Sequence, residues 1–276
     1  MRQVTLPGGE TVPALGQGTW YMGEKRGARK AEAEALRLGI DLGMTLIDTA
    51  EMYANGGAEE VVADASHGQR DKLFIVSKVL PSNASRSGVA AACERSLKRL
   101  GTDRIDLYLL HWRGSHPVAQ TLRAFQDLTQ QGKIRSFGVS NFDLDDMEVL
   151  SELPGGDACA SNQVLYNLTR RGIEWDLLPW SKRRRMPIMA YSPIEQGRLL
   201  SHQGLDAVVK RHGATPAQIA LAWVLNSGCI AIPRAREDAH VRENRAAADI
   251  RLTEQDLADL DRSFPPPKRK QPLGML

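Results

Sequence analysis

The sequence predicts a closed parallel barrel of eight strands, each followed by a helix, with a β-hairpin in front of it. Three observations predict this class: eight short apolar runs, amphipathic stretches between them, and no linker-like break along the chain. Apolar runs without polar alternation are typical of parallel strands that are buried on both faces. We therefore expect residues 1–276 to form one (β/α)8 TIM barrel domain of the α/β class.

The strands follow one another in a regular rhythm. A hairpin is expected first, because residues 4–6 and 11–12 are short strand-like segments around a glycine-containing turn at 7–9. The eight runs predicted as barrel strands are 14–20, 45–48, 73–78, 105–111, 134–140, 160–163, 187–191 and 229–233. The gap before the last run is longer than the others and leaves room for an extra loop or helix around 195–204.

Helical spacing fills the intervals between the runs. One apolar stripe predicts a helix that Gly101 would end: Val89, Cys93, Leu97 and Leu100. Thr215 followed by Pro216 predicts the start of a later helix. Thr253 with Asp256 offers a weaker capping arrangement near the C-terminal end.

A rival architecture is an open, doubly wound sheet with a glycine-rich phosphate loop. Gly16 and Gly18 suggest such a loop, but Tyr21 stands where its third glycine should be. The closed barrel is therefore the better interpretation.

Composition limits the classes of partner. With 42% hydrophobic and 25% charged residues and a formal charge of +3, the chain is typical of a soluble globular protein. This mild charge suits an anionic ligand but does not indicate nucleic acid. No run approaches the roughly 20 apolar residues that a bilayer requires. The three cysteines are far apart, which favours reduced thiols, so we expect a monomeric cytoplasmic protein without membrane or metal partners.

Polar side chains recur at the predicted strand ends. In a parallel barrel the functional site forms where strands end and the following loops begin. Six residues occupy such positions on six different strands: Asp48, Lys78, His111, Ser140, Gln163 and Tyr191. Alone, Asp48 could be a helix cap and His111 a core residue, but the common placement indicates a shared functional rim.

These residues suggest carbonyl chemistry once Tyr53, five residues after Asp48, is added. A phenol with a pKa of about 10 donates a proton poorly unless its phenolate is stabilised. The ammonium of Lys78 could supply that stabilisation, and Asp48 could hold the ammonium. His111 could orient a carbonyl oxygen toward the phenol. The arrangement predicts general-acid catalysis that needs no metal.

Along nearly its whole length the chain resembles the aldo-keto reductase superfamily. The motifs that carry the resemblance occur in the order GQGTWYMG, LIDTAEMY, IVSKV, DLYLLHW, KIRSFGVSNF, NQVLYN, MAYSPI and AIPRA. The resemblance implies that Asp48, Tyr53, Lys78 and His111 form a catalytic tetrad with Tyr53 as the acid. It also implies NADPH-dependent reduction of a small aldehyde, ketone or dicarbonyl on a barrel.

The same resemblance implies a cofactor site. The nicotinamide would meet Ser140, Asn141, Gln163 and Tyr191, and the pyrophosphate would follow Ser192, Pro193, Ile194 and Gly197. The adenosine end would meet Arg234, His240 and Asn244. Many relatives carry Lys-Ser where this chain has Arg234-Ala235, and often arginine where it has His240. Arg234 suits a 2′-phosphate because its guanidinium is always charged and can bond bidentately.

Trp20, His111 and Trp112 match positions that line the substrate mouth in this family. The loop after Trp112 is short and the tail after Phe264 is brief, so we expect an open pocket of broad selectivity. The basic residues 268–270 of this tail resemble a solvated segment, although they could fold over the active site. The glycines after Asn55 resemble a bacterial branch that includes methylglyoxal-reducing enzymes.

Two alternatives remain. One is a non-catalytic, nucleotide-binding regulatory subunit on the same fold. The other is a barrel glycosidase, which would need two carboxylates. Asp48 is the one acid among the six rim residues, which argues against this alternative.

Overall fold

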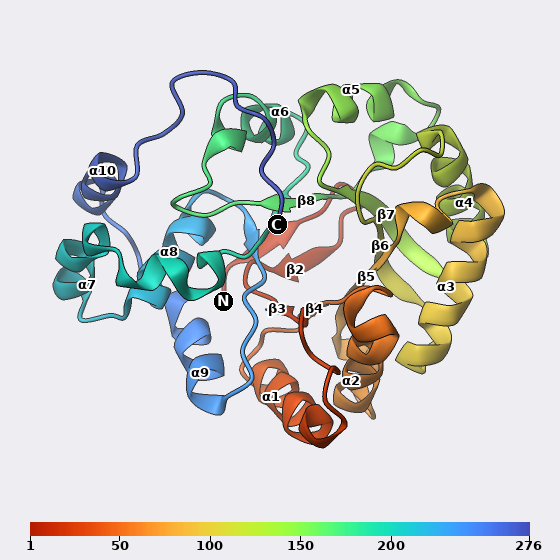
Figure 1. Ribbon diagram of the computed structural model, residues 1–276, viewed down its shortest axis with the longest axis horizontal. Coiled ribbons are helices and arrows are strands. Elements are labelled where there is room, and N and C mark those ends of the chain that lie inside the picture. Colours follow the sequence, from red (N-terminus) through yellow and green to blue (C-terminus); the bar gives the residue numbers. More distant parts are fainter.

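The computed structural model describes all residues from 1 to 276, and its eight parallel strands form a single sheet ordered from β10 through β9 and so on to β3. The two outer strands meet, because Leu15 forms a parallel bridge with Ala231 and the Gly16 amide donates to the Ala231 carbonyl at 2.9 Å. The sheet is therefore the barrel that the sequence predicted, with helices around it (Figure 1).

The strands are β1 (Gln3–Thr5), β2 (Thr11–Pro13), β3 (Gln17–Gly18), β4 (Leu46–Asp48), β5 (Phe74–Val79), β6 (Ile105–Leu110), β7 (Ile134–Ser140), β8 (Asn162–Leu165), β9 (Ile188–Tyr191) and β10 (Ile230–Ala231). The helices are α1 (Arg29–Asp41), α2 (Gly57–Ser66), α3 (Arg86–Leu100), α4 (Val118–Gln130), α5 (Leu144–Glu152), α6 (Leu177–Arg183), α7 (Asp206–His212), α8 (Pro216–Asn226), α9 (Asp238–Ala247) and α10 (Glu254–Ser263). None of the helices combines the length and apolar character that crossing a membrane requires.

Two apolar cores hold the barrel together. The larger core fills the layer between the strands and the surrounding helices. The smaller core fills the barrel interior with side chains such as Leu46, Val76 and Leu109. Leu6 and Val12 from the hairpin of β1 and β2 join this inner core, so the predicted hairpin closes one end of the barrel. The other end stays available for a site.

The predicted helix signals are confirmed. Gly101 caps α3 in the left-handed conformation with φ of 61°. Thr215 and Thr253 each form a complete capping box, because the third residue of each helix bonds back to the cap. The long gap before the last strand holds two 3-10 turns (Glu195–Ser201 and Gln203–Leu205) and the short helix α7.

Close packing, and not phosphate binding, explains why position 18 is a glycine. A Cβ atom at this position would lie 2.7 Å from the carbonyl oxygen of Ile232, in the strand region where the barrel closes. The glycine therefore allows the first and last strands to approach. This agrees with the rejection of a glycine-rich phosphate loop.

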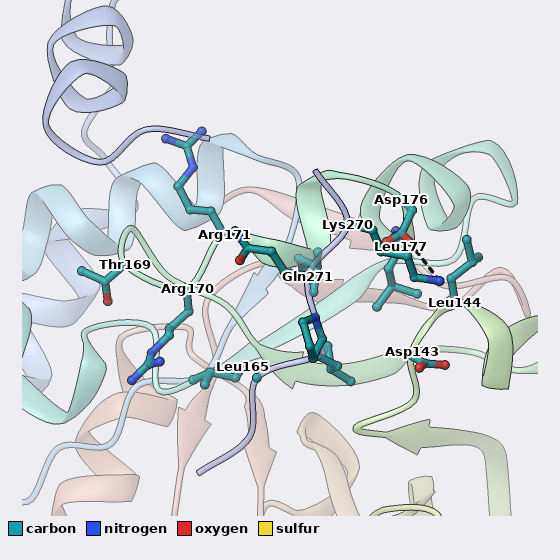
Figure 2. A pocket seen from close by; sticks show the side chains of 15 residues that line it. Asp143, Leu144, Leu165, Thr169, Arg170, Arg171, Asp176, Leu177, Lys270 and Gln271 are labelled. Atoms are coloured by element: carbon teal, nitrogen blue, oxygen red, sulfur yellow. Dashed lines mark hydrogen bonds and ion pairs between the residues drawn. The ribbon is translucent and has the colours of Figure 1, made fainter. Parts of the chain in front are cut away.

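The C-terminal tail crosses the open end of the barrel, which corrects the expectation that it leaves the mouth uncovered. Lys270 anchors the tail through ion pairs with Asp145 at 3.0 Å and Asp176 at 3.7 Å. Figure 2 shows the tail beside the segment that carries Arg170 and Arg171. Residues of both segments line a cavity of about 420 Å³. Beyond this anchor the tail reaches the barrel mouth. The sequence left this path open beside a solvated tail, because a short tail carries no signal for its direction.

Candidate active site

Strand alternation carries polar side chains from several barrel strands to the barrel mouth. Phe74 and Val76 of β5 lie in the inner core, so Lys78 points to the same interior. In the same way His111 follows Leu107 and Leu109 along β6. Alternate residues of these strands thus face the barrel interior, and the last of them are polar. The polar residues lie at the end of the barrel where the functional site was predicted.

Asp48, Lys78 and Tyr53 form a buried chain of hydrogen bonds. The Lys78 ammonium donates to Asp48 Oδ2 at 2.8 Å, to the Thr49 carbonyl at 2.9 Å and to the Tyr53 hydroxyl oxygen at 3.1 Å. Lys78 is fully buried and Asp48 is 3% exposed. The predicted contact between the amine and the phenol is present.

The charged pair beneath the phenol is mutually supported. Burial raises the pKa of Asp48, while Lys78 and Gln163 oppose this rise by donating to its carboxylate. Burial alone would lower the pKa of Lys78, but the charges of Asp48 and Tyr53 outweigh burial and raise it. Lys78 therefore remains an ammonium at neutral pH.

The pKa of Tyr53 corrects one part of the sequence argument. Burial is the largest influence and raises this pKa above 10, while Lys78 lowers it only in part. The phenol is therefore fully protonated at neutral pH. The ammonium stabilises the phenolate left after proton transfer, so it keeps the pKa of Tyr53 below the value that burial alone would give.

His111 is a neutral group in this site. Burial and then the nearby Lys78 charge lower its pKa to about 2. Its ring meets the Tyr53 ring edge-on with 5.7 Å between centroids. The buried Nδ1 atom has no hydrogen-bond partner. A neutral imidazole beside the phenol can hydrogen-bond an uncharged oxygen without adding a competing acid.

One cavity of about 640 Å³ collects most of the predicted site residues. Its lining includes Trp20, Asp48, Tyr53, His111, Trp112, Ser140, Asn141, Gln163, Tyr191, Ser192, Pro193, Ile194, Gly197 and Arg234. Lys78 is not a lining residue, but it donates to Asp48 and Tyr53, which are. His240 and Asn244, both on α9, are not among the lining residues. Asp48 is the one acidic residue of the lining, and it is paired with Lys78.

The amides at the cavity floor already have partners. Gln163 donates to Asp48 Oδ1 at 2.7 Å, which ties β8 to β4 across the barrel. Asn141 donates to the His111 carbonyl at 3.2 Å and accepts from the Tyr191 hydroxyl at 3.0 Å. These bonds fix the orientation of the Tyr191 ring at the cavity wall.

The far side of the cavity is formed by unusual backbone and by a cation. Ser192, Glu195 and Gln196 all have positive φ, between 46° and 55°. Arg234 extends from the barrel end, and its guanidinium lies over the Tyr21 ring at 5.6 Å. A flat ring, amide groups, a tight turn and an arginine thus follow one another along the cavity.

Several lining residues were missed by sequence reasoning. Tyr21, Met52 and Gln196 follow or precede predicted site residues directly, so adjacency to a motif was the available signal. Met275 and Leu276 carried no signal, because only the path of the tail brings them to the mouth.

Comparisons with known proteins agree with this geometry. The sequence pattern of the family described as Aldo/keto reductase family matches residues 14–264. The chain is 52% identical to the methylglyoxal reductase YeaE of Escherichia coli, covering 100% of this chain and 99% of that protein. It is 33% identical to a glyoxal reductase of Bacillus subtilis, over 94% and 91% of the two chains.

Solved structures give the same answer. The chain is similar to an aldo-keto reductase from Klebsiella pneumoniae crystallised in complex with NADPH, with a TM-score of 0.97 and 50% identity over 100% of both chains. A second structure from that organism, in complex with NADP and acetate, also has a TM-score of 0.97 and 50% identity, over 99% of both chains.

Proposed function

Because this chain belongs to the aldo/keto reductase family, we propose that it is an NADPH-dependent reductase of small aldehydes, ketones or dicarbonyls. The observation that carries this proposal is the buried chain Asp48–Lys78–Tyr53 with neutral His111 at the mouth of a closed barrel. A phenol above an ammonium is an arrangement suited to protonating an oxygen on which negative charge develops.

The cavity residues fit the parts of NADPH in order. Ser140, Asn141 and Gln163 offer hydroxyl and amide groups for a carboxamide, and Tyr191 offers a flat face for the nicotinamide ring. The turn from Ser192 through Pro193 and Ile194 to Gly197 is proposed for the pyrophosphate. Arg234 is proposed for the 2′-phosphate, with His240 and Asn244 beyond it toward the adenosine.

The proposed reaction assigns one task to each tetrad residue. A bound NADPH supplies a hydride to the carbonyl carbon. Tyr53 donates its proton to the carbonyl oxygen as charge develops there, and Lys78 stabilises the resulting phenolate. Asp48 holds Lys78 in place, and His111 orients the carbonyl oxygen toward the phenol. A proton from solvent then restores Tyr53.

We propose methylglyoxal and related dicarbonyls as substrates, because the two relatives named above are a methylglyoxal reductase and a glyoxal reductase. Trp20 and Trp112 line the same cavity and are proposed to contact the substituents of the carbonyl. We further propose that residues 1–276 work as one domain and a monomer in the cytoplasm. The three free, buried cysteines support a reducing compartment.

The test is a screen with each reduced nicotinamide against methylglyoxal, glyoxal and simple aldehydes, following the absorbance of the reduced cofactor. We expect turnover with NADPH and at least one dicarbonyl. Tight NADPH binding without turnover on any carbonyl would instead indicate a regulatory nucleotide-binding protein. Absence of both binding and turnover would overturn the proposal entirely.

A further inference from the structure

Tyr53 stands on a turn that the backbone alone does not favour. The three residues after it, Ala54, Asn55 and Gly56, all have positive φ, of 49°, 52° and 92°. Consecutive left-handed residues persist only where the surrounding structure enforces them. The position of the proposed acid therefore depends on contacts made by its neighbours.

The turn is packed from two sides. On one side a Cβ atom at Gly56 would lie 2.4 Å from Cδ and Nε of Arg99, so this arginine lies directly against the turn. On the other side a Cβ atom at Gly57 would lie 2.9 Å from the carbonyl oxygen of Gly23. The placement of the Arg99 side chain is thus one wall of the Tyr53 turn.

A buried carboxylate fixes that wall. Glu59, fully buried in the first turn of α2, accepts from Arg99 Nε and from the Ser77 hydroxyl, each at 2.6 Å. Ser77 precedes Lys78 on β5, so the two side chains point to opposite faces of the strand. Glu59 therefore ties the end of the Tyr53 turn to the strand that carries Lys78.

A second carboxylate does the same on the other side of Tyr53. Glu51, 9% exposed, accepts from the Leu80 amide at 2.8 Å and from Asn83 Nδ2 at 2.9 Å. It also pairs with Arg95 at 3.5 Å. Arg95 lies one helical turn before Arg99 on α3, so both carboxylates meet arginines of the same helix.

We infer that Glu51 and Glu59 are positioning residues that hold the Tyr53 turn against β5 and α3. This inference rests on the proposed role of Tyr53 as the acid. Glu59 acts through Arg99 and Ser77, and Glu51 acts through the chain that follows β5. The pairs Glu51–Arg95 and Glu59–Arg99 are each neutral overall, so their effect on Tyr53 is geometric and adds no net charge.

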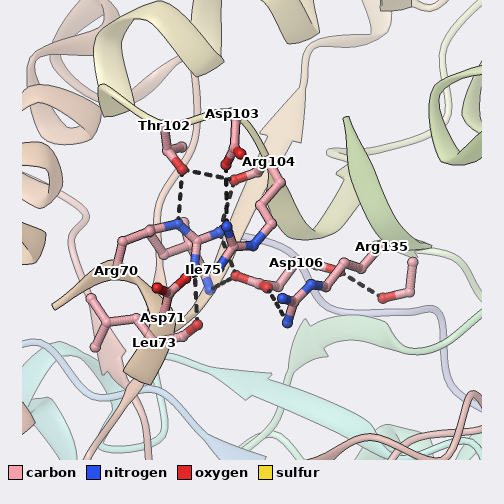
Figure 3. A network of polar contacts seen from close by, with 10 residues as sticks. Arg70, Asp71, Leu73, Ile75, Thr102, Asp103, Arg104, Asp106 and Arg135 are labelled. Atoms are coloured by element: carbon pink, nitrogen blue, oxygen red, sulfur yellow. Dashed lines mark hydrogen bonds and ion pairs between the residues drawn. The ribbon is translucent and has the colours of Figure 1, made fainter. Parts of the chain in front are cut away.

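The barrel offers a matched control far from the mouth. Asp106, near the start of β6, is fully buried like Glu59 and also pairs with arginines, Arg70 at 2.7 Å and Arg135 at 3.0 Å (Figure 3). It accepts from the Ile75 amide at 2.8 Å. Replacing this carboxylate disturbs a comparable network without touching the Tyr53 turn.

The experiment compares Glu51→Met, Glu59→Gln and Asp106→Asn in the full chain. Leu80 and Asn83 both donate to Oε1 of Glu51, so a glutamine could keep both bonds, whereas a methionine of similar length removes them. Arg99 and Ser77 donate to the two different carboxylate oxygens of Glu59. In Glu59→Gln the Ser77 hydroxyl can accept from the new amide NH2 group while the amide oxygen faces Arg99, so the main loss is the negative charge of the Arg99 partner. The bond from Arg99 is then no longer charge-assisted at both ends, and the wall of the turn loosens. The measurements are the single-turnover rate of carbonyl reduction, the NADPH dissociation constant, the melting temperature and the 13C shift of the Tyr53 ring. Tyr53→Phe assigns that ring signal.

We expect both glutamate variants to reduce the carbonyl about 10- to 100-fold more slowly while NADPH affinity stays within about two-fold, because small displacements of reacting groups are costly. The Tyr53 ring signal should move in both. Asp106→Asn should have a lower melting temperature than the wild type. Its single-turnover rate should stay within about two-fold of the wild-type rate, and its Tyr53 signal should not move.

Equal rate losses in all three variants, or a glutamate variant with a normal rate and an unmoved Tyr53 signal, would overturn the inference. If Glu59→Gln does not fold, Arg99→Lys keeps the charge but lacks the planar group against Gly56, and the same slowing is expected. If the wild-type protein reduces no carbonyl, the proposed function fails, while the ring signal still decides whether the carboxylates position Tyr53.

Discussion

Substitution of Arg234 by alanine isolates the part of the cavity proposed to choose between the two nicotinamide cofactors. The guanidinium of Arg234 lies at the cavity wall over the Tyr21 ring, 5.6 Å from its centroid. The neighbouring Arg236 is already engaged with Glu32 at 3.2 Å. Arg234 is thus the arginine of this segment placed to meet an anion in the cavity.

The expected size of the effect follows from the bond that is lost. A hydrogen bond to a charged group contributes about 1.5–3 kcal/mol, and the exposure of Arg234 favours the lower half of that range. At about 1.4 kcal/mol per factor of ten, NADPH should bind about 10- to 40-fold more weakly to Arg234→Ala. NADH lacks the 2′-phosphate, so its affinity should change by less than about three-fold.

Fluorescence titration of both reduced cofactors against wild type, Arg234→Ala and Arg236→Ala provides the assay. Arg236→Ala is the matched control, because it removes an arginine of the same segment whose charge is already paired. Equal losses of NADPH and NADH affinity in Arg234→Ala would refute the assignment. A larger NADPH loss in Arg236→Ala would transfer the phosphate contact to that residue.

Three further outcomes are expected. Reduction needs protonated Tyr53, whose pKa burial raises above 10, so the single-turnover rate should stay level across neutral pH and fall only at higher pH; a decline centred near pH 7 would contradict this. Lys78→Met leaves Asp48 buried without its cation, so the free energy of unfolding measured with denaturant should fall by about 3–5 kcal/mol and activity should be lost. An unchanged free energy of unfolding would show that the pair is dispensable. Removing Met275 and Leu276 uncovers the cavity mouth, so KM for small carbonyls should rise about 3- to 10-fold at constant kcat. An unchanged KM would show that the tail does not contact the substrate.

The sequence predicted the site residues correctly where they lie at the end of a strand whose other residues pack in the barrel interior. Asp48, Lys78 and His111 each continue an alternating series of interior residues, so strand parity and barrel topology together bring Asp48 and His111 to one cavity and Lys78 into contact with Asp48. Tyr53 lies outside any strand, and only its spacing from Asp48 and the family resemblance indicated its place. The structure adds the contact at 3.1 Å to Lys78.

The remaining features depend on long-range paths that local patterns do not encode. Met275 and Leu276 reach the cavity through the path of the tail, along which Lys270 pairs with Asp145 and Asp176, residues that lie far from it in the sequence. Glu59 looks like an ordinary acidic residue near a helix start, and only the packing of α2 against α3 pairs it with Arg99. The pKa of Tyr53 likewise reflects burial that its neighbours in sequence do not reveal.

The most direct test of the account is the single-turnover rate of carbonyl reduction by Tyr53→Phe with NADPH already bound. The substitution removes only the hydroxyl, while Lys78 keeps its bonds to Asp48 and the Thr49 carbonyl, so the fold and the NADPH affinity should be preserved. Loss of a general acid should slow the reaction by about 10²- to 10⁴-fold. A variant that binds NADPH normally and still reduces the carbonyl at nearly the wild-type rate would contradict the assignment of Tyr53 as the proton donor.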